Sequence, residues 1–531
     1  MSRDCANAAE WRSPARSAPP RHPCAIDMPQ WMRYADRRRS IRRRPEVSMK
    51  WKGSIALLMS CGLSALAIAH EPAAPAATPA PAAKAGPPFV AYDQSLLAFT
   101  HADVIDGTGA PIRRDQTLLI EDGKIRALGA SAKVAVPKGA TVIDAKGKTL
   151  LPGLVMMHEH MFYPTGQGNY SEMVHSFPSL YLAGGVTTLR TAAAMQPYAD
   201  LNMRKKIADG AIIGPDMEVT SPLLNGPGLP VLAVKVLDGA DDAERAVNYW
   251  ADEGVDSYKA YMQIRRDELQ RMIEVAHRRS RKVTAHLCSV TFAEASAMGI
   301  DNLEHGFSFA SDFVADKQPD VCPASITRSL ADLDVDAPQM QRLIELLVER
   351  KVALTSTLPV IETLAAQRPK VSEAALSLLL PEVREQYEAG WTAMQSKPGG
   401  QDWARLLPKL GQWERRFVAA GGLLMAGTDP TGYGGVIPGY ASKRQLELMV
   451  EAGFTFEQAV RVASLNGARY LGRDKSVGSL EAGKRADVVV IDGDPTRDAR
   501  AIERMPLVFK AGKGYRTEAI FEAMKGKVGL H

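Results

Sequence analysis

Short apolar runs alternate with amphipathic helical segments from residue 151 to residue 477, and this alternation restricts the chain to few folds. Residues 267–277 are typical of the helical segments, because apolar side chains recur there every three or four positions. The apolar runs are predicted to be strands at residues 153–157, 186–190, 218–220, 257–261, 283–287, 302–305, 352–357 and 423–427. Such strand–helix units predict an α/β fold, a (β/α)8 TIM barrel, in which functional side chains lie at the C-terminal ends of the strands.

The two flanks of this region have a different pattern, in which short alternating β segments are joined by Asp-Gly and Lys-Gly turns. Each flank is too short to bury a core by itself, so we expect residues 89–150 and 478–531 to pair into one small β-sandwich domain. The barrel would then comprise residues 151–477. The stretches 306–351 and 361–421 exceed a normal βα loop and are predicted to be helical insertions that cover the barrel mouth.

Positive charge is concentrated at the start of the chain. The sequence has 65 Lys and Arg and 60 Asp and Glu, and residues 1–52 hold 13 of the former and 5 of the latter. The remainder is therefore slightly acidic, which argues against a nucleic-acid partner. We interpret residues 1–48 as an N-terminal extension created by a start codon placed too early, with an Arg-rich binding arm as the alternative.

Residues 49–69 have the features of a secretory signal peptide: a basic start, a short apolar stretch, and Ala67 and Ala69 at the −3 and −1 positions. The apolar stretch is short for a bilayer, so we expect cleavage and no permanent membrane span. A lipoprotein attached through Cys61 is a weaker interpretation. Residues 70–88 are rich in Ala and Pro and are predicted to be a linker. The sequence thus predicts a periplasmic or secreted protein.

Five side chains of metal-binding types, His158, His160, His286, His305 and Asp429, lie at the ends of predicted strands, and Lys259 lies inside another of these strands. Two His residues two positions apart on a strand face the same side and can bind one ion. A single buried His is usually a core residue, and a strand-end Asp is often a helix cap. Their joint placement at the ends of strands instead predicts a metal site at the barrel mouth.

The segment from Leu151 to His160, Leu-Pro-Gly-Leu-Val-Met-Met-His-Glu-His, resembles the first-strand signature of the amidohydrolase superfamily. Thr428 and Asp429 resemble its last-strand aspartate motif, and residues 478–492 resemble its return to the small β domain. The resemblance covers roughly residues 95–515. Within the superfamily, the chain resembles the imidazolonepropionase-like branch, which includes metal-dependent Xaa-Pro dipeptidases and carboxypeptidases.

This resemblance implies a ligand set for two divalent metal ions. His158, His160 and Asp429 would bind the more buried ion, and His286 and His305 the more exposed one. Lys259 would bridge both as a carbamate, because an ammonium group cannot lie between two dications. Zinc is the expected metal, and manganese, cobalt and iron also suit these ligands.

The implied reaction is hydrolysis of an amide bond by a metal-bridging hydroxide. Asp429 would be both ligand and proton carrier. Tyr261 and Arg190 are predicted to bind the oxyanion or a substrate carboxylate, with ordinary packing or salt bridging as the alternative. Phe162, Tyr163 and Asn225 are weaker candidates for pocket residues.

The expected substrate is a small molecule or dipeptide, for example an N-acyl amino acid. One alternative is a mononuclear cyclic-amide hydrolase or deaminase, which would leave Lys259 uncarbamylated. A more remote alternative is a catalytically inactive binding protein. The sequence leaves open whether the chain forms a homo-oligomer and whether Cys288 and Cys322, the cysteines beyond the signal peptide, are bonded.

Overall fold

The computed structural model describes residues 89–530 except residues 167, 230 and 232. The predicted N-terminal extension, signal peptide and linker, which together comprise residues 1–88, lie outside the described residues. No helix within the described part is long and apolar enough to cross a bilayer.

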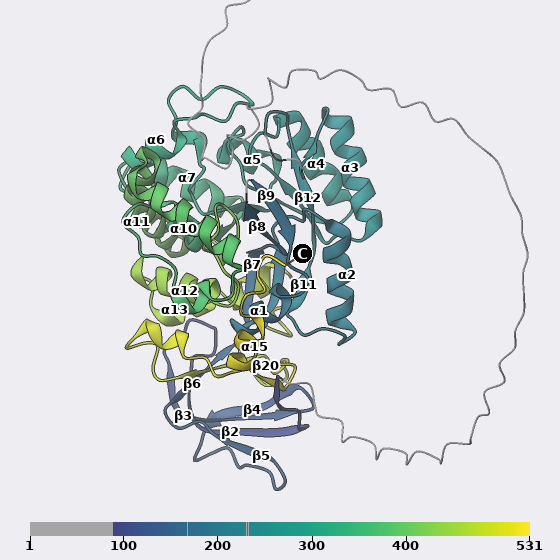
Figure 1. Cartoon of the computed structure of the whole chain (residues 1–531), viewed down its shortest axis with the longest axis vertical. Helices are drawn as coiled ribbons and strands as arrows, with labels where there is room; N and C mark the ends of the chain where they lie inside the picture. Colours follow the sequence, from purple (N-terminus) through teal and green to yellow (C-terminus); the bar gives the residue numbers. More distant parts are fainter. Residues whose placement is uncertain (1–88, 167, 230, 232, 531) are drawn as a thin grey trace, which may run out of the picture.

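A set of parallel strands lies at the centre of the protein, among the helices (Figure 1). Its strands in sequence order are β7 (Leu154–Glu159), β10 (Val186–Thr191), β11 (Asp216–Glu218), β12 (Thr220–Asn225), β14 (Ser257–Ala260), β15 (Lys282–Ala285), β16 (Asn302–Glu304), β17 (Ala353–Ser356) and β18 (Leu424–Ala426). Each of the eight predicted strand segments overlaps one of them. The third predicted segment, residues 218–220, differs most from the structure, because two consecutive strands, β11 and β12, lie there and the second extends to Asn225.

Hydrogen bonds connect these strands into two parallel sheets of a TIM-barrel-like arrangement, one of three strands and one of seven, the second of which also includes β13 (Lys235–Val236). β10 pairs with β7 and β11, whereas β12 pairs with β14, and the remaining strands follow in order to β18. Beyond β18, the backbone N–H groups of Thr428 and Asp429 donate to the His158 carbonyl at 3.0 and 3.1 Å. The last strand therefore returns to the first at the end where the predicted ligands lie.

Helices surround these sheets. They are α1 (Phe177–Ala183), α2 (Pro197–Ala208), α3 (Ala240–Glu253), α4 (Arg266–Arg278), α5 (Phe292–Met298), α6 (Ile326–Asp332), α7 (Pro338–Glu349), α8 (Leu358–Leu364), α9 (Glu373–Leu376), α10 (Pro381–Ser396), α11 (Pro398–Ala419), α12 (Ala441–Glu451), α13 (Phe456–Val462) and α14 (Leu465–Tyr470). Helix α4 shows why they form: Leu269, Met272, Ile273 and Ala276 lie on one face and are buried, as its periodicity predicts. At the N-terminal end of the barrel, Asn466 of α14 donates to the Leu424 carbonyl.

Both flanks of the chain contribute to one mixed sheet. Its nine strands are β1 (Val90–Tyr92), β2 (Leu96–Val104), β3 (Arg113–Glu121), β4 (Lys124–Ala130), β5 (Thr141–Asp144), β6 (Lys148–Pro152), β19 (Val488–Asp492), β20 (Leu507–Lys510) and β21 (Lys513–Arg516). β6 pairs with β19, which joins the two flanks. The Phe99 and Phe509 rings lie 5.1 Å apart although two strands separate β2 from β20, so the sheet curls over its own core. The facing layers expected of a sandwich thus belong to a single sheet.

Strand β19 connects this sheet to the barrel through its two faces. Val488 and Val490 belong to the core enclosed by the sheet, whereas Val489 and Ile491 belong to the core of the barrel. This is the two-residue alternation of a strand buried on both sides. The mixed sheet is therefore packed against the barrel at β19.

The C-terminal segment differs from its predicted place in the small domain. Helix α15 (Thr517–Met524) packs against α1, and Leu380 donates through its backbone to the Val528 carbonyl at 2.8 Å. Figure 1 shows α15 beside α1, above the mixed sheet. Residues 517–530 are therefore part of the barrel surface.

The segments beyond the strand ends build the barrel mouth. The predicted insertions contain α6 and α7 in the first stretch and α8 to α11 in the second, together with the 3-10 turn η3 (Ser311–Phe313). A hairpin that the sequence did not indicate, β8 (Phe162–Gly166) and β9 (Asn169–Glu172), follows β7. Helix α10 packs against β8, and the Gly435 N–H donates to the Tyr163 hydroxyl at 2.9 Å.

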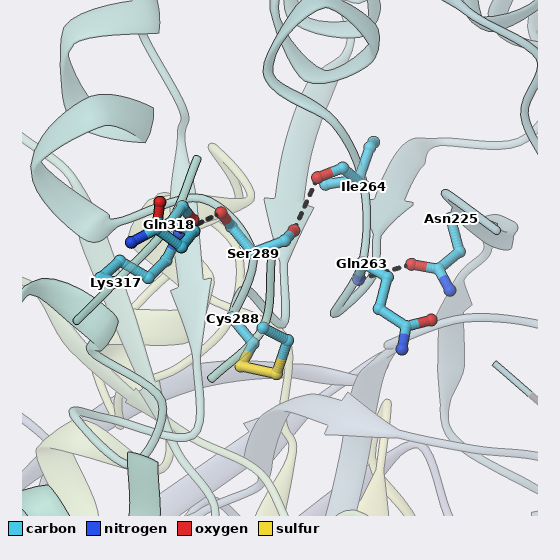
Figure 2. The surroundings of a disulfide bond; sticks show 8 residues. Asn225, Gln263, Ile264, Cys288, Ser289, Lys317 and Gln318 are labelled. Carbon is cyan, nitrogen blue, oxygen red and sulfur yellow. Dashed lines mark hydrogen bonds between the residues drawn. A yellow bond between two sulfur atoms is a disulfide. The ribbon is translucent and has the colours of Figure 1, made fainter. Parts of the chain in front are cut away.

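A disulfide between Cys288 and Cys322 ties the first insertion to the loop after β15 (Figure 2). The neighbouring Ser289 donates from its hydroxyl to the Ile264 carbonyl at 2.6 Å, and Lys317 donates to the Ser289 carbonyl at 2.5 Å. The bond therefore lies within a chain of contacts that joins the loops after β14 and β15 to the insertion. Cys288 is buried and follows the predicted ligand His286 by two residues.

We expect Cys288→Ala/Cys322→Ala to lower the unfolding temperature by several degrees. The bridged residues are 34 positions apart, and closing a loop of that length stabilises a protein by about 3–4 kcal/mol through the unfolded chain. Differential scanning fluorimetry with and without dithiothreitol measures the effect. The double variant should not respond to the reductant; an unfolding temperature equal to that of the oxidised wild type would contradict this role.

Candidate metal centre

The end of β7 directs two histidines into the barrel. Between the pairs Leu189–Met156 and Thr191–Glu159, β10 advances by two residues and β7 by three, which is a bulge in β7. A bulge interrupts the alternation of side chains along a strand. Met157 and its neighbour His158 therefore both face the barrel interior. His160 then faces the same side as His158, as the sequence predicted for this pair.

His305 and Asp429 extend the cluster from β16 and from the segment after β18. Both have backbone conformations in the left-handed region, with φ of 66° and 60°. Such conformations are uncommon outside glycine and concentrate at functional sites, where they redirect side chains. Ligand atoms of His158, His305 and Asp429 lie within 4.8 Å of one another, a spacing that suits one metal ion.

The other predicted ligands surround this group. Nε2 of His160 lies 3.2 Å from Oδ1 of Asp429, and the His286 ring centre lies 4.4 Å from that of His305. Lys259 is fully buried in β14, and its Nζ lies 4.0 Å from Oε1 of Glu304. The structure thus brings all six predicted side chains to one end of the barrel.

The imidazole contacts leave nitrogen atoms available for a metal. Nδ1 of His158 contacts Glu304 at 2.7 Å, and Nδ1 of His160 contacts the Ala193 carbonyl at 3.1 Å. A histidine whose Nδ1 donates in this way presents the lone pair of Nε2. Nε2 of His286 is buried without a hydrogen-bond partner among the described residues. This orphaned nitrogen and the inward Nε2 atoms fit a bound divalent cation.

The electrostatics also suit cation binding. Burial lowers the pKa of His160, His286 and His305, which keeps these rings in the neutral form that binds metals. Despite its burial, Asp429 has a pKa well below the usual range, because His158 and its other imidazole neighbours favour the carboxylate. Burial lowers the pKa of Lys259 to about 8. A larger share of Lys259 is therefore the neutral amine, which is the form that can react with carbon dioxide.

Arg190 does not lie where its predicted role requires. Its guanidinium is buried in the barrel interior and donates to the Met157 carbonyl at 2.9 Å, to Asn302 at 3.0 Å and to Glu304 at 2.5 Å. The group also lies over the ring of Tyr470, toward the N-terminal end of the barrel. These contacts favour the alternative that the sequence left open, in which Arg190 forms a buried salt bridge, over the binding of an oxyanion or a substrate carboxylate.

The remaining candidates have mixed positions. The Tyr261 ring is partly exposed and lies 4.9 Å from His286, and the buried Phe162 ring lies 4.3 Å from His160. Both are therefore beside the ligands. Tyr163 is fully buried against Gly435, and Asn225 accepts from the Gln263 backbone at the rim, so these two side chains have structural contacts.

Two further aromatic side chains, which the sequence did not indicate, lie near the cluster. Phe309, which follows β16, lies 4.1 Å from the His286 ring and 6.0 Å from Trp403 of α11. Together with Phe162 and Tyr261, it gives the ligands an apolar surrounding. Phe309 comes from an insertion, where no strand pattern marks which side chain faces the site.

Comparisons with known proteins agree with this arrangement. The profile of the Amidohydrolase family matches residues 149–527. A solved structure assigned as a prolidase from Bifidobacterium longum is 26% identical, with a TM-score of 0.58 over 81% of this chain and 99% of that one. A Xaa-Pro dipeptidase with bound methionine is 18% identical, with a TM-score of 0.58 over 80% of this chain and 100% of that one, and shares the fold.

Curated relatives match over shorter stretches. Imidazolonepropionase of Stenotrophomonas maltophilia is 32% identical over 108 residues, which is 19% of this chain and 26% of that enzyme. The chain therefore spans about a quarter of the length of this relative. The match supports common ancestry and leaves the substrate open.

Proposed function

This chain belongs to the amidohydrolase family, and from that premise we propose that it is a binuclear metallohydrolase that cleaves the amide bond of a dipeptide or an N-acyl amino acid. The observation that carries the proposal is the convergence of His158, His160, Lys259, His286, His305 and Asp429 at one end of the barrel. That the chain is a metal-dependent amidohydrolase follows from its family and from the buried His158–His305–Asp429 group.

In the proposed site, His158, His160 and Asp429 would hold one ion, and His286 and His305 would hold the other. A carbamate on Lys259 would bind both ions. Divalent ions bound there would supply a nucleophilic water at neutral pH and polarise the scissile carbonyl. The low pKa of Asp429 keeps its carboxylate charged at neutral pH. The Thr431 hydroxyl, which donates to Oδ1 of Asp429 at 2.9 Å, helps to fix its orientation.

Proton transfer and stabilisation of the oxyanion are assigned to two different side chains. Asp429 accepts a proton at a carboxylate oxygen and delivers it to the leaving nitrogen, as expected of a positioned general base and acid. Tyr261 is a candidate donor to the oxyanion. Burial and the charge of Asp429 raise its pKa above the usual value, so its phenol keeps its proton.

The aromatic surrounding supports an apolar group on the substrate. Phe162 and Phe309 lie against two different ligand histidines, so a bound amide would have aromatic surface beside it. The likeness to a structure assigned as a prolidase supports small peptide substrates. The signal-peptide pattern of residues 49–69 supports export, which favours peptides or other amides outside the cytoplasm.

A mononuclear cyclic-amide hydrolase or deaminase is the second candidate. The observation in its favour is the 4.0 Å separation between Lys259 and Glu304, which suits an ion pair of an unmodified lysine. In that case Lys259 would not bridge two ions.

The test is a substrate panel with zinc-loaded protein. We expect release of the amine product from at least one Xaa-Pro dipeptide, other dipeptide or N-acyl amino acid, followed by liquid chromatography with mass detection. Turnover should disappear with a chelator and return with a divalent metal. His286→Ala should abolish it, whereas His277→Ala, which changes a surface histidine paired with Asp301, should not. Ring opening of cyclic amides or deamination as the only reaction would contradict the proposal.

A further inference from the structure

We propose that Glu304 and Arg190 form a buried clamp that positions His158 for metal binding. The inference rests on the proposed function, because it concerns how the same site is held. It assigns a positioning role to Glu304, which the sequence analysis missed, and replaces the role predicted for Arg190.

Glu304 holds the side chain of His158. Its Oε2 accepts from Nδ1 of His158 at 2.7 Å. Its Oε1 accepts from Nη2 of Arg190 at 2.5 Å and also from the Thr284 hydroxyl. A carboxylate that accepts from Nδ1 fixes both the ring orientation and the tautomer, so that Nε2 carries the lone pair. Nε2 of His158 lies 3.7 Å from Oδ1 of Asp429, on the side where the metal would bind.

Arg190 holds the backbone of the same segment. Its Nε donates to the carbonyl of Met157 at 2.9 Å, directly before His158 and within the bulge of β7. Its Nη2 donates to both Glu304 and Asn302. The single guanidinium therefore connects the peptide that carries His158 to the carboxylate that orients the His158 ring.

The rest of the barrel interior makes this clamp rigid. Oδ1 of Asn302 also accepts from Thr355 at 3.1 Å and lies 2.9 Å from the Thr284 hydroxyl, and its amide donates to the Ala353 carbonyl. These contacts come from β15, β16 and β17. Glu304 and Arg190 are 1% exposed or less, so water does not compete for their hydrogen bonds. The contact between these opposite charges offsets part of the cost of burying each of them.

The geometry of β16 allows Glu304 to reach His158. Neighbouring residues of a strand normally face opposite sides, yet both Glu304 and His305 face the barrel interior. The left-handed backbone of His305 breaks the alternation and makes this possible. Adjacent positions thus supply one predicted ligand and the group that orients another.

The test measures zinc affinity rather than turnover. Glu304→Gln removes the charge, and Glu304→Asp keeps the charge for Arg190 while shortening the reach to His158. We expect either variant to raise the zinc dissociation constant about 10- to 100-fold, measured by competition with a chromogenic chelator. The rise in unfolding temperature on adding zinc should shrink in parallel, whereas the metal-free unfolding temperature of Glu304→Asp should stay near that of the wild type.

Glu268→Gln is the matched control, because Glu268 is also fully buried and paired with an arginine, Arg265, but lies on α4 without contact to a predicted ligand. Its zinc dissociation constant should stay within about threefold of the wild-type value. If Glu304→Gln does not fold, Glu304→Asp decides the question. If the wild type binds zinc and Glu304→Asp binds it equally well, the clamp is wrong and the proposed function stands. A wild type that binds no zinc would overturn the proposed function and the clamp with it.

Discussion

Replacing Asp429 by Asn is expected to lower kcat by at least about a hundredfold while the fold is retained. Oδ1 of Asp429 lies 3.2 Å from His160, and Oδ2 lies 3.7 Å from His305, so the carboxylate is at the centre of the cluster. Asn has the same size and can still accept from Thr431, but it carries no charge and cannot accept the proton. Circular dichroism would confirm the fold, and steady-state turnover of a substrate found in the panel gives kcat.

Asp256→Asn is the control for this variant. Asp256 precedes β14 at the opposite end of the barrel, where it accepts from Arg204 and from the Val219 backbone. Losing that carboxylate should change stability and not kcat. An Asp429→Asn enzyme with a kcat within threefold of the wild-type value would reject the catalytic role of Asp429.

Lys259→Met is the second change with a large expected effect. The side chain is fully buried in β14, and Met preserves much of its volume without an amine that could form a carbamate. We expect the bound metal to fall by at least one equivalent per chain and kcat to fall by about a hundredfold or more. Elemental analysis by mass spectrometry and steady-state kinetics measure the two effects.

Lys443→Met is the matched control, because Lys443 is likewise buried, at 2% exposure, but lies on α12 and contacts Glu503. It should retain the full metal content and kcat. A Lys259→Met protein that binds as much metal as Lys443→Met would remove the lysine from the site and favour the mononuclear alternative.

The sequence predicted the strand positions and the site-forming side chains because both depend on local patterns. Several barrel strands coincide with short apolar runs, and a parallel barrel places every strand end at the same rim. His158, His286, His305 and Asp429 could therefore be grouped before their distances were known. That the two flanks form one sheet was also foreseeable, because neither flank could bury a core alone, whereas the particular pairing of β6 with β19 was not predicted.

Tertiary contacts determine what the sequence could not indicate. A strand-end arginine can point outward to substrate or inward to a buried acid, and Arg190 points inward because Glu304 and Asn302 are there to accept its hydrogen bonds. Glu304 itself was missed because regular alternation places it opposite His305, and the left-handed turn of His305 is not visible in the sequence. Phe309 and the β8–β9 hairpin belong to loops without periodicity.

The number of metal ions bound per chain tests the central claim most directly. Wild-type protein would be dialysed to equilibrium against zinc in the presence of bicarbonate, and its metal content determined by elemental mass spectrometry. The arrangement of the four histidines, Lys259 and Asp429 predicts about two equivalents per chain. A plateau at one equivalent, or no retained metal, would contradict the two-metal site.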